Sequence, residues 1–181
     1  KINIAMNKKK ILALIPARMG SSRFPGKPMK KINGKPMIQH VYERVSKNSQ
    51  ITSTYVATCD SEISTYLNKL GAKFMMTSKK HERASDRTAE ALLKIEKKTK
   101  LKFDIVVLLQ GDEPMTNSNM ISKAVKPLIE NSEIKISNLY TSISSVEEFE
   151  NPNEVKVVLD NNEYALYFSR EPIPSRKKGI L

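Results

Sequence analysis

Three cationic side chains stand close together near the amino end of the chain. They lie within residues 16–28, which read Pro-Ala-Arg-Met-Gly-Ser-Ser-Arg-Phe-Pro-Gly-Lys-Pro, at Arg18, Arg23 and Lys27. The same stretch offers backbone freedom and hydroxyl and amide donors, at Gly20, Gly26, Ser21 and Ser22. Converging cations and exposed amides are what a polyphosphate requires. The stretch is not a Walker A loop, since proline follows Lys27. A basic surface loop with turn glycines is the alternative interpretation.

A second candidate is an acidic turn. Residues 110–114 read Gln-Gly-Asp-Glu-Pro and follow the apolar run 106–109. A carboxylate at the end of a strand, here Asp112, can hold Mg²⁺ against phosphate oxygens. The alternative is an ordinary strand-end turn, because turns favour such polar residues in any case.

Two further side chains could contact a ligand. His81 opens the polar stretch 81–87, but a single histidine without a partner is a poor argument for a general base. Arg170 follows the apolar run 165–168 and could form a bidentate pair with a carboxylate. An ordinary exposed arginine at a strand end is equally consistent with the pattern.

Short β-branched runs alternate with longer amphipathic segments along the chain. The predicted strands cover residues 11–15, 54–58, 73–76, 104–109, 134–143, 155–160 and 164–168. The predicted helices carry apolar residues from Ile38 to Val45, Ile63 to Leu70, Ala89 to Ile95 (with Leu92 and Leu93, capped by Ser85) and Met120 to Leu128. This alternation predicts an α/β fold, a three-layer sandwich with a mostly parallel central sheet. Ligands bind outside the carboxyl ends of such strands, so the loops after the first and fourth strands are the places to look.

Composition excludes several classes. The only cysteine, Cys59, rules out an internal disulfide framework and suits a reducing cytoplasm. No apolar run approaches a membrane span, and residues 11–15 are too short for a signal peptide. The net charge of +12 fits a polyanionic ligand or simply a solvated lysine-rich surface. With five phenylalanines, six tyrosines and no recognition motif, a nucleic-acid partner is not expected.

The ordered motifs resemble those of the CMP-Kdo synthetases, the 3-deoxy-manno-octulosonate cytidylyltransferases. The resemblance is carried by Pro16-Ala17-Arg18, Ser22-Arg23-x-Pro25-Gly26-Lys27-Pro28, residues 33–38, Gln110-Gly111-Asp112-Glu113-Pro114-Met115, residues 151–158 and residues 165–170. It extends from about Ile11 to Pro174. It implies a Rossmann-like nucleotidyltransferase domain over 11–181, incomplete at the C-terminus, after a leader or flexible N-terminus over 1–10.

The resemblance also implies a reaction and roles for residues. CTP would give CMP to the anomeric hydroxyl of Kdo and release pyrophosphate, for lipopolysaccharide biosynthesis in the cytoplasm. The implied catalytic residues are Lys27, Arg18 and Asp112, with Asp112 also the ligand of the cofactor Mg²⁺. The implied nucleotide-binding residues are Arg18, Ser21, Ser22, Arg23, Lys27, Ser85 and Arg87, and the substrate-binding residues are Gln110 and Arg170. Glu113 stays unassigned. The expected partners are CTP and the acidic sugar, with a homodimer in the full-length form and neither nucleic acid nor membrane.

The sequence departs from the family pattern in two places. Residues 82–84 read Glu-Arg-Ala where the family shows Gln-Ser-Gly, and Ser-Arg-Lys-Lys follows Pro174 in place of a tryptophan and acidic residues. Activation of another 2-keto-3-deoxy sugar acid (amino-Kdo or a nonulosonate), or a catalytically silent nucleotide-binding remnant, therefore remains an alternative. A second metal-binding aspartate is expected after Leu181, so these 181 residues alone should be weakly active.

Overall fold

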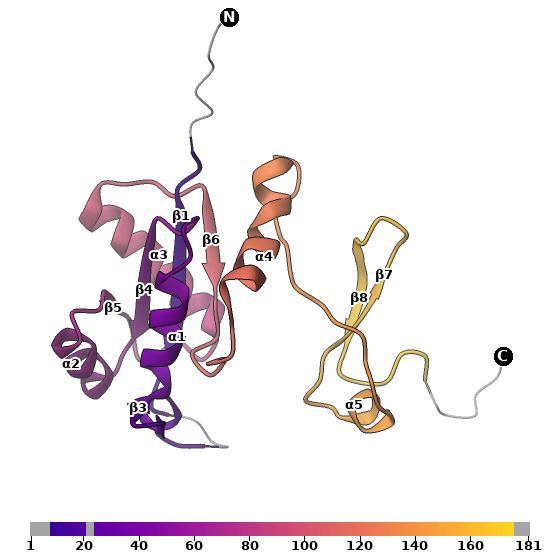
Figure 1. Cartoon of the computed structure of the whole chain (residues 1–181), viewed down its shortest axis with the longest axis horizontal. Helices are drawn as coiled ribbons and strands as arrows, with labels where there is room; N and C mark the ends of the chain where they lie inside the picture. Colours follow the sequence, from indigo (N-terminus) through magenta and orange to yellow (C-terminus); the bar gives the residue numbers. More distant parts are fainter. Residues whose placement is uncertain (1–7, 21–23, 176–181) are drawn as a thin grey trace, which may run out of the picture. The chain divides into compact units, whose positions relative to one another are not determined.

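The chain folds as two compact units, Lys1–Ser137 and Asn138–Leu181, which are described separately (Figure 1). The computed structural model describes residues 8–20 and 24–175. Within these ranges, no helix is both long and apolar enough to cross a membrane.

The first unit is built on a parallel sheet of four strands in the order β5-β4-β1-β6. The strands are β1 (Ile11–Ala17), β4 (Ser53–Thr58), β5 (Phe74–Met76) and β6 (Ile105–Leu108). In the register, Leu14 of β1 lies between Tyr55 of β4 and Leu108 of β6. The predicted α/β fold with a parallel central sheet is confirmed, and the carboxyl ends of β1 and β6 lie side by side.

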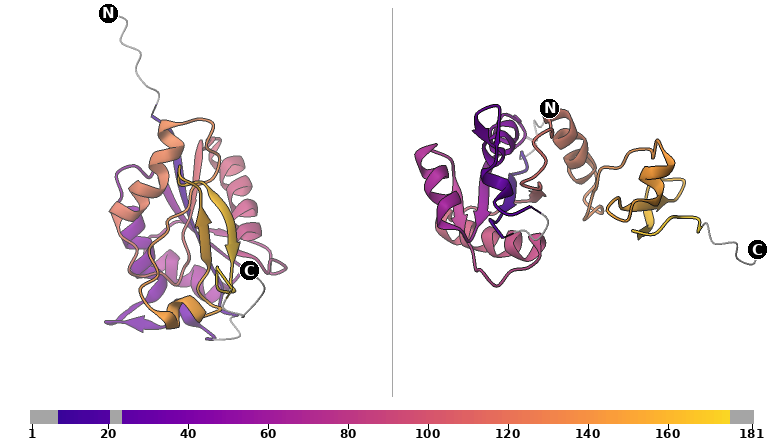
Figure 2. Two further views of the ribbon diagram at one scale, coloured as in Figure 1. Left: turned by 90° about the vertical axis from the view of Figure 1, so that its right-hand side faces the viewer. Right: turned by 90° about the horizontal axis from the view of Figure 1, so that it is seen from below.

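Helices cover both faces of this sheet, as Figures 1 and 2 show. They are α1 (Met37–Ser46), α2 (Ser61–Lys69), α3 (Ala84–Thr99) and α4 (Ser118–Glu130). Alternate residues of β1 face opposite layers: Ala13 and Ile15 pack with side chains of α1, α2 and α4, whereas Leu12 and Leu14 pack with α3. All seven residues of β1 are buried, as its apolar sequence predicts for a strand covered on both faces. Between β1 and α1 lie a short 3-10 helix, η1 (Lys27–Met29), and a small antiparallel pair, β2 (Lys31–Ile32) and β3 (Lys35–Pro36).

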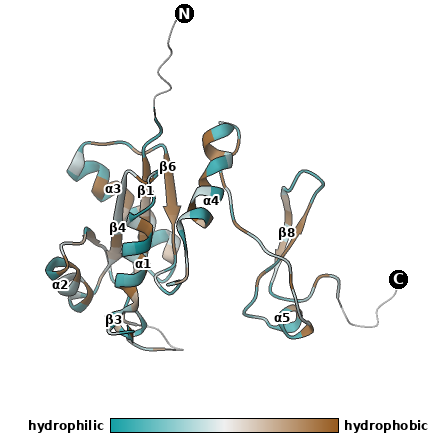
Figure 3. Cartoon of the chain, viewed as in Figure 1, coloured by the Kyte–Doolittle hydropathy of each residue, from teal (hydrophilic) through white to brown (hydrophobic). Residues whose placement is uncertain are grey.

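The second unit contains α5 (Val146–Glu150) and an antiparallel pair, β7 (Lys156–Leu159) and β8 (Ala165–Ser169). Lys156 is 4% exposed, and its ammonium group donates hydrogen bonds to the carbonyl oxygens of Asn151, Glu154 and Arg170. These bonds tie the segment after α5 to the end of β8. Figure 3 shows hydrophobic residues on β8, and Leu166, Tyr167 and Phe168 are all exposed.

The structure corrects four expectations about individual elements. Residues 134–143 form no strand. Apolar residues of that segment, such as Ile136 at 79% exposure, find no neighbouring strand in the described chain, and a β-branched run without a pairing partner is not stable as a strand. The strands at 155–160 and 164–168 do form, but as an antiparallel pair outside the parallel sheet. The continuous apolar run within 104–109 is typical of a strand covered on both faces, yet β6 is an edge strand among the described residues and Leu108 is 39% exposed.

The fourth correction concerns α3. The helix begins at Ala84 with Arg83 at the N-cap position, so Ser85 lies inside the first turn and does not cap it. Its buried side chains include Arg87, Ala91 and Ile95, whereas Leu93 is 66% exposed. The apolar residues alone therefore do not identify the buried face of α3. The charged residue Arg87 occupies one of the inward positions, and the apolar residue Leu93 points to solvent.

Candidate active site

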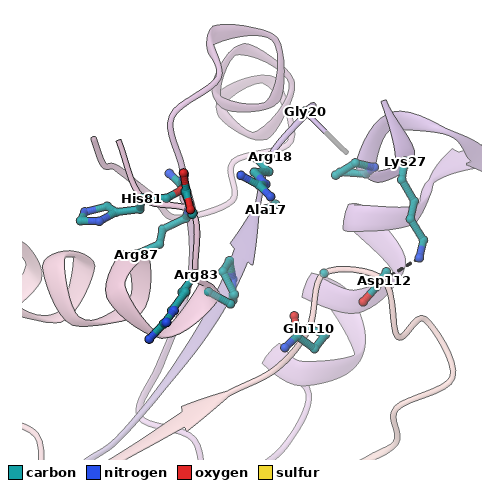
Figure 4. Close-up of a pocket in the computed structure, with 14 residues that line it drawn as sticks. Ala17, Arg18, Gly20, Lys27, His81, Arg83, Arg87, Gln110 and Asp112 are labelled. Carbon is teal, nitrogen blue, oxygen red and sulfur yellow. Dashed lines mark hydrogen bonds and ion pairs between the residues drawn. The ribbon is translucent and has the colours of Figure 1, made fainter. Parts of the chain in front are cut away.

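A pocket of about 290 Å³ opens at the carboxyl ends of β1 and β6 (Figure 4). Its lining residues are Pro16, Ala17, Arg18, Gly20, Lys27, Pro28, His81, Glu82, Arg83, Ala84, Arg87, Gln110, Gly111 and Asp112. They come from the loop after β1, the segment that leads into α3, and the turn after β6. The two loops indicated by the sequence thus border one cavity, as the rule for ligand sites in parallel sheets predicts.

Lys27 and Asp112 form an ion pair in this pocket. The Nζ atom of Lys27 lies 2.7 Å from Oδ2 of Asp112, and the two side chains are 33% and 46% exposed. Figure 4 shows the lysine reaching from η1 to the turn after β6. A pair this exposed is worth little in free energy, so either side chain can exchange its partner for a ligand.

The loop after β1 is held by an aspartate outside the pocket lining. Oδ2 of Asp60, which follows β4, accepts a hydrogen bond of 2.8 Å from the backbone N–H of Met19. The carbonyl oxygen of Met19 accepts a bond of 2.9 Å from the N–H of Gly26, which has a φ of 71°. Glycine adopts this left-handed conformation without strain. Together these contacts fix the two ends of the loop that carries Arg18 and Lys27.

The turn after β6 lies close against β1. A Cβ atom at Gly111 would lie 2.9 Å from the carbonyl oxygen of Pro16, a distance that real Cβ atoms do not show. The glycine is thus needed for close approach to β1. This approach brings Gln110 and Asp112, on either side of the glycine, to the pocket.

The remaining wall of the pocket is fixed by α3. Arg87 is 3% exposed and donates to Oγ1 of Thr77 at 2.5 Å and to the carbonyl oxygen of His81 at 3.3 Å. The imidazole Nε2 of His81 lies 2.5 Å from Oε2 of Glu90. Figure 4 shows this ring directed away from Lys27 and Asp112. His81 thus lines the pocket with its ring bonded to Glu90 and turned away from the ion pair.

Glu90 has several hydrogen-bond partners. Hydrogen bonds from the side chain of Lys94 and from the backbone N–H of Ser78 are the largest causes that lower the pKa of Glu90 to about 2. Burial opposes them, and the bond from His81 lowers the pKa by a smaller amount. Each partner favours the ionised carboxylate. Glu90 is therefore charged at neutral pH.

Residues 12–180 match the profile of the family described as cytidylyltransferase. The chain belongs to the cytidylyltransferase family. Within it, the similarity is to CMP-Kdo synthetases. The 3-deoxy-manno-octulosonate cytidylyltransferase of Geotalea uraniireducens is 46% identical over 166 residues, which cover 92% of this chain and 64% of that protein. The protein of the same name from Thermodesulfovibrio yellowstonii is 47% identical over 172 residues, covering 93% of this chain and 67% of that protein.

A solved structure supports the same relationship. CMP:2-keto-3-deoxy-manno-octonic acid synthetase complexed with CTP aligns with a TM-score of 0.82 and 39% identity, over 94% of this chain and 68% of that one. This cytidylyltransferase chain spans about 64% of the length of the Geotalea relative.

The structure brings together five of the predicted site residues of this cytidylyltransferase. They line one pocket and are Arg18, Lys27, Arg87, Gln110 and Asp112. Ser85 is exposed in the first turn of α3 and is not part of the lining. Ser21, Ser22 and Arg23 lie outside the described residues. Arg170 belongs to the second unit, where its Nη1 atom donates to the carbonyl oxygen of Pro152 at 2.9 Å.

Sequence reasoning missed two carboxylates that support the pocket, Asp60 and Glu90. Both accept hydrogen bonds from backbone N–H groups of loops distant in sequence, and no spacing rule reports such contacts. It also left open the roles of Glu82 and Arg83, which depart from the family pattern and do line the pocket.

Proposed function

We propose that the protein transfers CMP from CTP to the anomeric hydroxyl of 3-deoxy-manno-octulosonate and releases pyrophosphate. The observation that carries the proposal is the meeting of Arg18, Lys27 and Asp112 in one pocket at the ends of β1 and β6. The names of the relatives and the CTP in the aligned structure support this choice of nucleotide and sugar.

The chemistry needs positioning and charge neutralisation more than covalent participation by the protein. The sugar hydroxyl oxygen bonds to the α-phosphorus of CTP as its proton passes to solvent water. The bond from that phosphorus to the bridging oxygen breaks, and its electron pair leaves with pyrophosphate. Arg18 and Lys27 supply positive charge where negative charge develops on the phosphate oxygens.

Asp112 is the residue that we propose to hold Mg²⁺. Among the described residues, no three His, Cys, Asp or Glu side chains form a group that could hold a metal by themselves. Mg²⁺ is commonly bound by one or two carboxylates together with substrate phosphates, so one half-exposed aspartate beside a phosphate site fits the ion. When bound, the ion would offset negative charge on the phosphate oxygens. In the ligand-free chain, Lys27 neutralises this carboxylate instead.

We further propose that Gln110, which lines the pocket beside Asp112, contacts the sugar acid. The contact of Arg170 with a carboxylate stays a prediction from the sequence, based on the planar geometry of its guanidinium. Arg87, which lines the pocket, would contribute to the nucleotide side. The nucleotide contact implied for Ser85 stays a prediction, since this residue lies outside the pocket lining. A role in lipopolysaccharide biosynthesis, a cytoplasmic location and a homodimeric full-length protein complete the proposal.

The test is pyrophosphate release by the full-length protein. It should require CTP, Mg²⁺ and the sugar acid together, and a panel of 2-keto-3-deoxy sugar acids should show the highest kcat/KM for 3-deoxy-manno-octulosonate. Lys27→Ala and Asp112→Ala should each lower kcat about 10²- to 10³-fold. Lys27→Ala removes positive charge opposite the reacting phosphates, and Asp112→Ala removes the proposed ligand of Mg²⁺.

A second lysine of the first unit supplies the control. Lys35 forms an ion pair of 3.2 Å with Glu43 and does not line the pocket. Lys35→Ala removes a comparable surface pair and should leave kcat within about twofold of the unmodified protein. Unchanged turnover in both pocket variants would overturn the assignment of these residues.

A further inference from the structure

One face of α3 forms hydrogen bonds with residues 76–81, the segment that precedes the pocket wall. Arg87, Glu90 and Lys94 follow the spacing i, i+3 and i+7, which places them on one side of the helix. Arg87 holds Thr77 and the carbonyl oxygen of His81. Lys94 donates to the carbonyl oxygen of Met76 at 3.0 Å.

Glu90 is the central member of this row. Its Oε2 atom accepts a hydrogen bond of 2.8 Å from the backbone N–H of Ser78 and lies 2.5 Å from the imidazole of His81. Its Oε1 atom lies 2.7 Å from Nζ of Lys94. The carboxylate is 24% exposed and lies outside the pocket lining. Both of its oxygens are thus used within the protein.

The segment held by these hydrogen bonds has no regular secondary structure after Thr77. Residues 78–83 belong to no helix or strand, and the bonding to β4 ends at Thr77, whose N–H donates to the carbonyl oxygen of Thr58 at 2.8 Å. The segment runs directly into Glu82, Arg83 and Ala84, which line the pocket. Its position therefore depends on side-chain contacts such as those from α3.

We propose that Glu90 is a positioning residue, which holds residues 78–83 in the conformation that nucleotide binding requires. The inference rests on the proposed function, since the ligand in question is the nucleotide of that reaction. Glu90 lies outside the pocket lining and does not contact the nucleotide itself. It acts through the amide of Ser78 and the ring of His81, whose neighbours form the wall beside the phosphate-binding cations.

The same helix offers a matched control. Glu96 also accepts hydrogen bonds from a lysine and a backbone amide: Lys102 at 2.5 Å and Phe103 at 3.1 Å. Its pKa is also lowered, with the bond from Lys102 as the largest cause. Glu96 does not line the pocket, and its partners follow the C-terminal end of α3. Glu96→Gln therefore makes the same chemical change where no effect on the nucleotide is expected.

The experiment compares Glu90→Gln and Glu96→Gln in the full-length protein. Calorimetric titration with CTP should show binding about tenfold weaker in Glu90→Gln and unchanged in Glu96→Gln. Both variants lose charged hydrogen bonds, but only those of Glu90 hold the segment that forms the pocket wall. The KM for CTP should rise by a similar factor while kcat changes less. Hydrogen exchange at the amide of Ser78 should become faster in Glu90→Gln alone. Lys94→Met, which removes one partner of Glu90, should have a smaller effect in the same direction.

The outcomes separate the two proposals. Equal loss of CTP affinity in both glutamine variants would indicate general destabilisation and overturn the role of Glu90. An unchanged affinity and an unchanged exchange rate in Glu90→Gln would overturn it as well. If the unmodified protein did not bind CTP, the proposed function would fail. The exchange rate of the Ser78 amide would then still decide whether Glu90 holds the segment.

Discussion

Two residues that carry no reactive group, Gly111 and Asp60, determine the positions of the loops around the pocket. Gly111 leaves room for the carbonyl oxygen of Pro16, and Asp60 fixes the backbone of Met19. Gly111 thus sets how closely the turn that carries Asp112 approaches β1, and Asp60 fixes the loop that carries Arg18.

Gly111→Ala should destabilise the fold. The added Cβ would lie 2.9 Å from a backbone oxygen of the central strand, so β1 or the turn must shift. We expect the free energy of unfolding in urea to fall by about 1–3 kcal/mol. Gly20→Ala is the control, since a Cβ built there meets nothing within 4 Å, and it should change stability by about 0.5 kcal/mol or less. Equal stability of the two variants would contradict the contact.

The stabilisation that Glu90 supplies should depend on pH. Its pKa is lowered from 4.5 to about 2, so the folded state binds a proton less readily than the unfolded state. The contribution is therefore complete above the unfolded pKa and is lost as the pH falls from about 4.5 toward 2. The unfolding free energy of the unmodified protein minus that of Glu90→Gln should be largest at pH 6–7, on the order of 1–3 kcal/mol, and shrink at low pH. A difference that grows on acidification would show the opposite sign of the effect.

At the scale of elements, the central strand and the helices on its two faces organise the unit. β1 is buried along its length, and alternate side chains serve the two layers. Helix α3 has a second task, because its polar inward residues hold the segment before the pocket. The layer that forms the core on that face thus also forms the pocket wall.

Two substitutions in α3 test which of its faces is buried. Ile95 is fully buried, whereas Leu93 is 66% exposed. Ile95→Ala should lower the free energy of unfolding by about 2–5 kcal/mol, because it leaves a cavity against β1. Leu93→Ala should cost about 0.5 kcal/mol or less. Urea denaturation of both variants measures these changes. A large loss of unfolding free energy in Leu93→Ala would mean that Leu93 lies on the buried face, as the apolar spacing suggests.

The strands and helices of the first unit follow from apolar periodicity, because their inward residues are mostly Ile, Leu, Val and Ala. The pattern failed at Arg87, a buried cation that periodicity counts as surface. It also failed at residues 134–143, where β-branched residues have the propensity but no partner strand. The location of the pocket was predictable because strand ends in a parallel sheet converge. The supporting carboxylates were not, since a contact from Asp60 or Glu90 to a distant amide leaves no periodic trace.

At the scale of the whole molecule, the contacts divide the chain into two units, and all the pocket residues belong to the first. The prediction of one domain over 11–181 stays a prediction. The boundary lies within residues 132–144, a stretch with neither helix nor strand. The first site of proteolytic cleavage therefore tests whether this stretch is the accessible boundary between the two units.

Limited trypsin digestion should cut after Lys135 before it cuts after Lys123. Both side chains are exposed, but Lys123 lies within α4, and proteases need an extended backbone. Lys135→Gln should remove the early cut without accelerating cleavage at Lys123. Mass spectrometry of the fragments provides the measurement. Earlier cleavage after Lys123 would mean that α4 opens more readily than the segment that follows it.

The contact between Lys27 and Asp112 has a consequence for which solutes the cavity admits. Each group already has a counterion, so a lone anion must displace the carboxylate and a lone cation must displace the ammonium. A solute that carries both signs of charge offers each group a replacement in a single event. Because the exposed pair is weak, this preference over lone inorganic ions is small, and it favours ligands whose opposite charges arrive together.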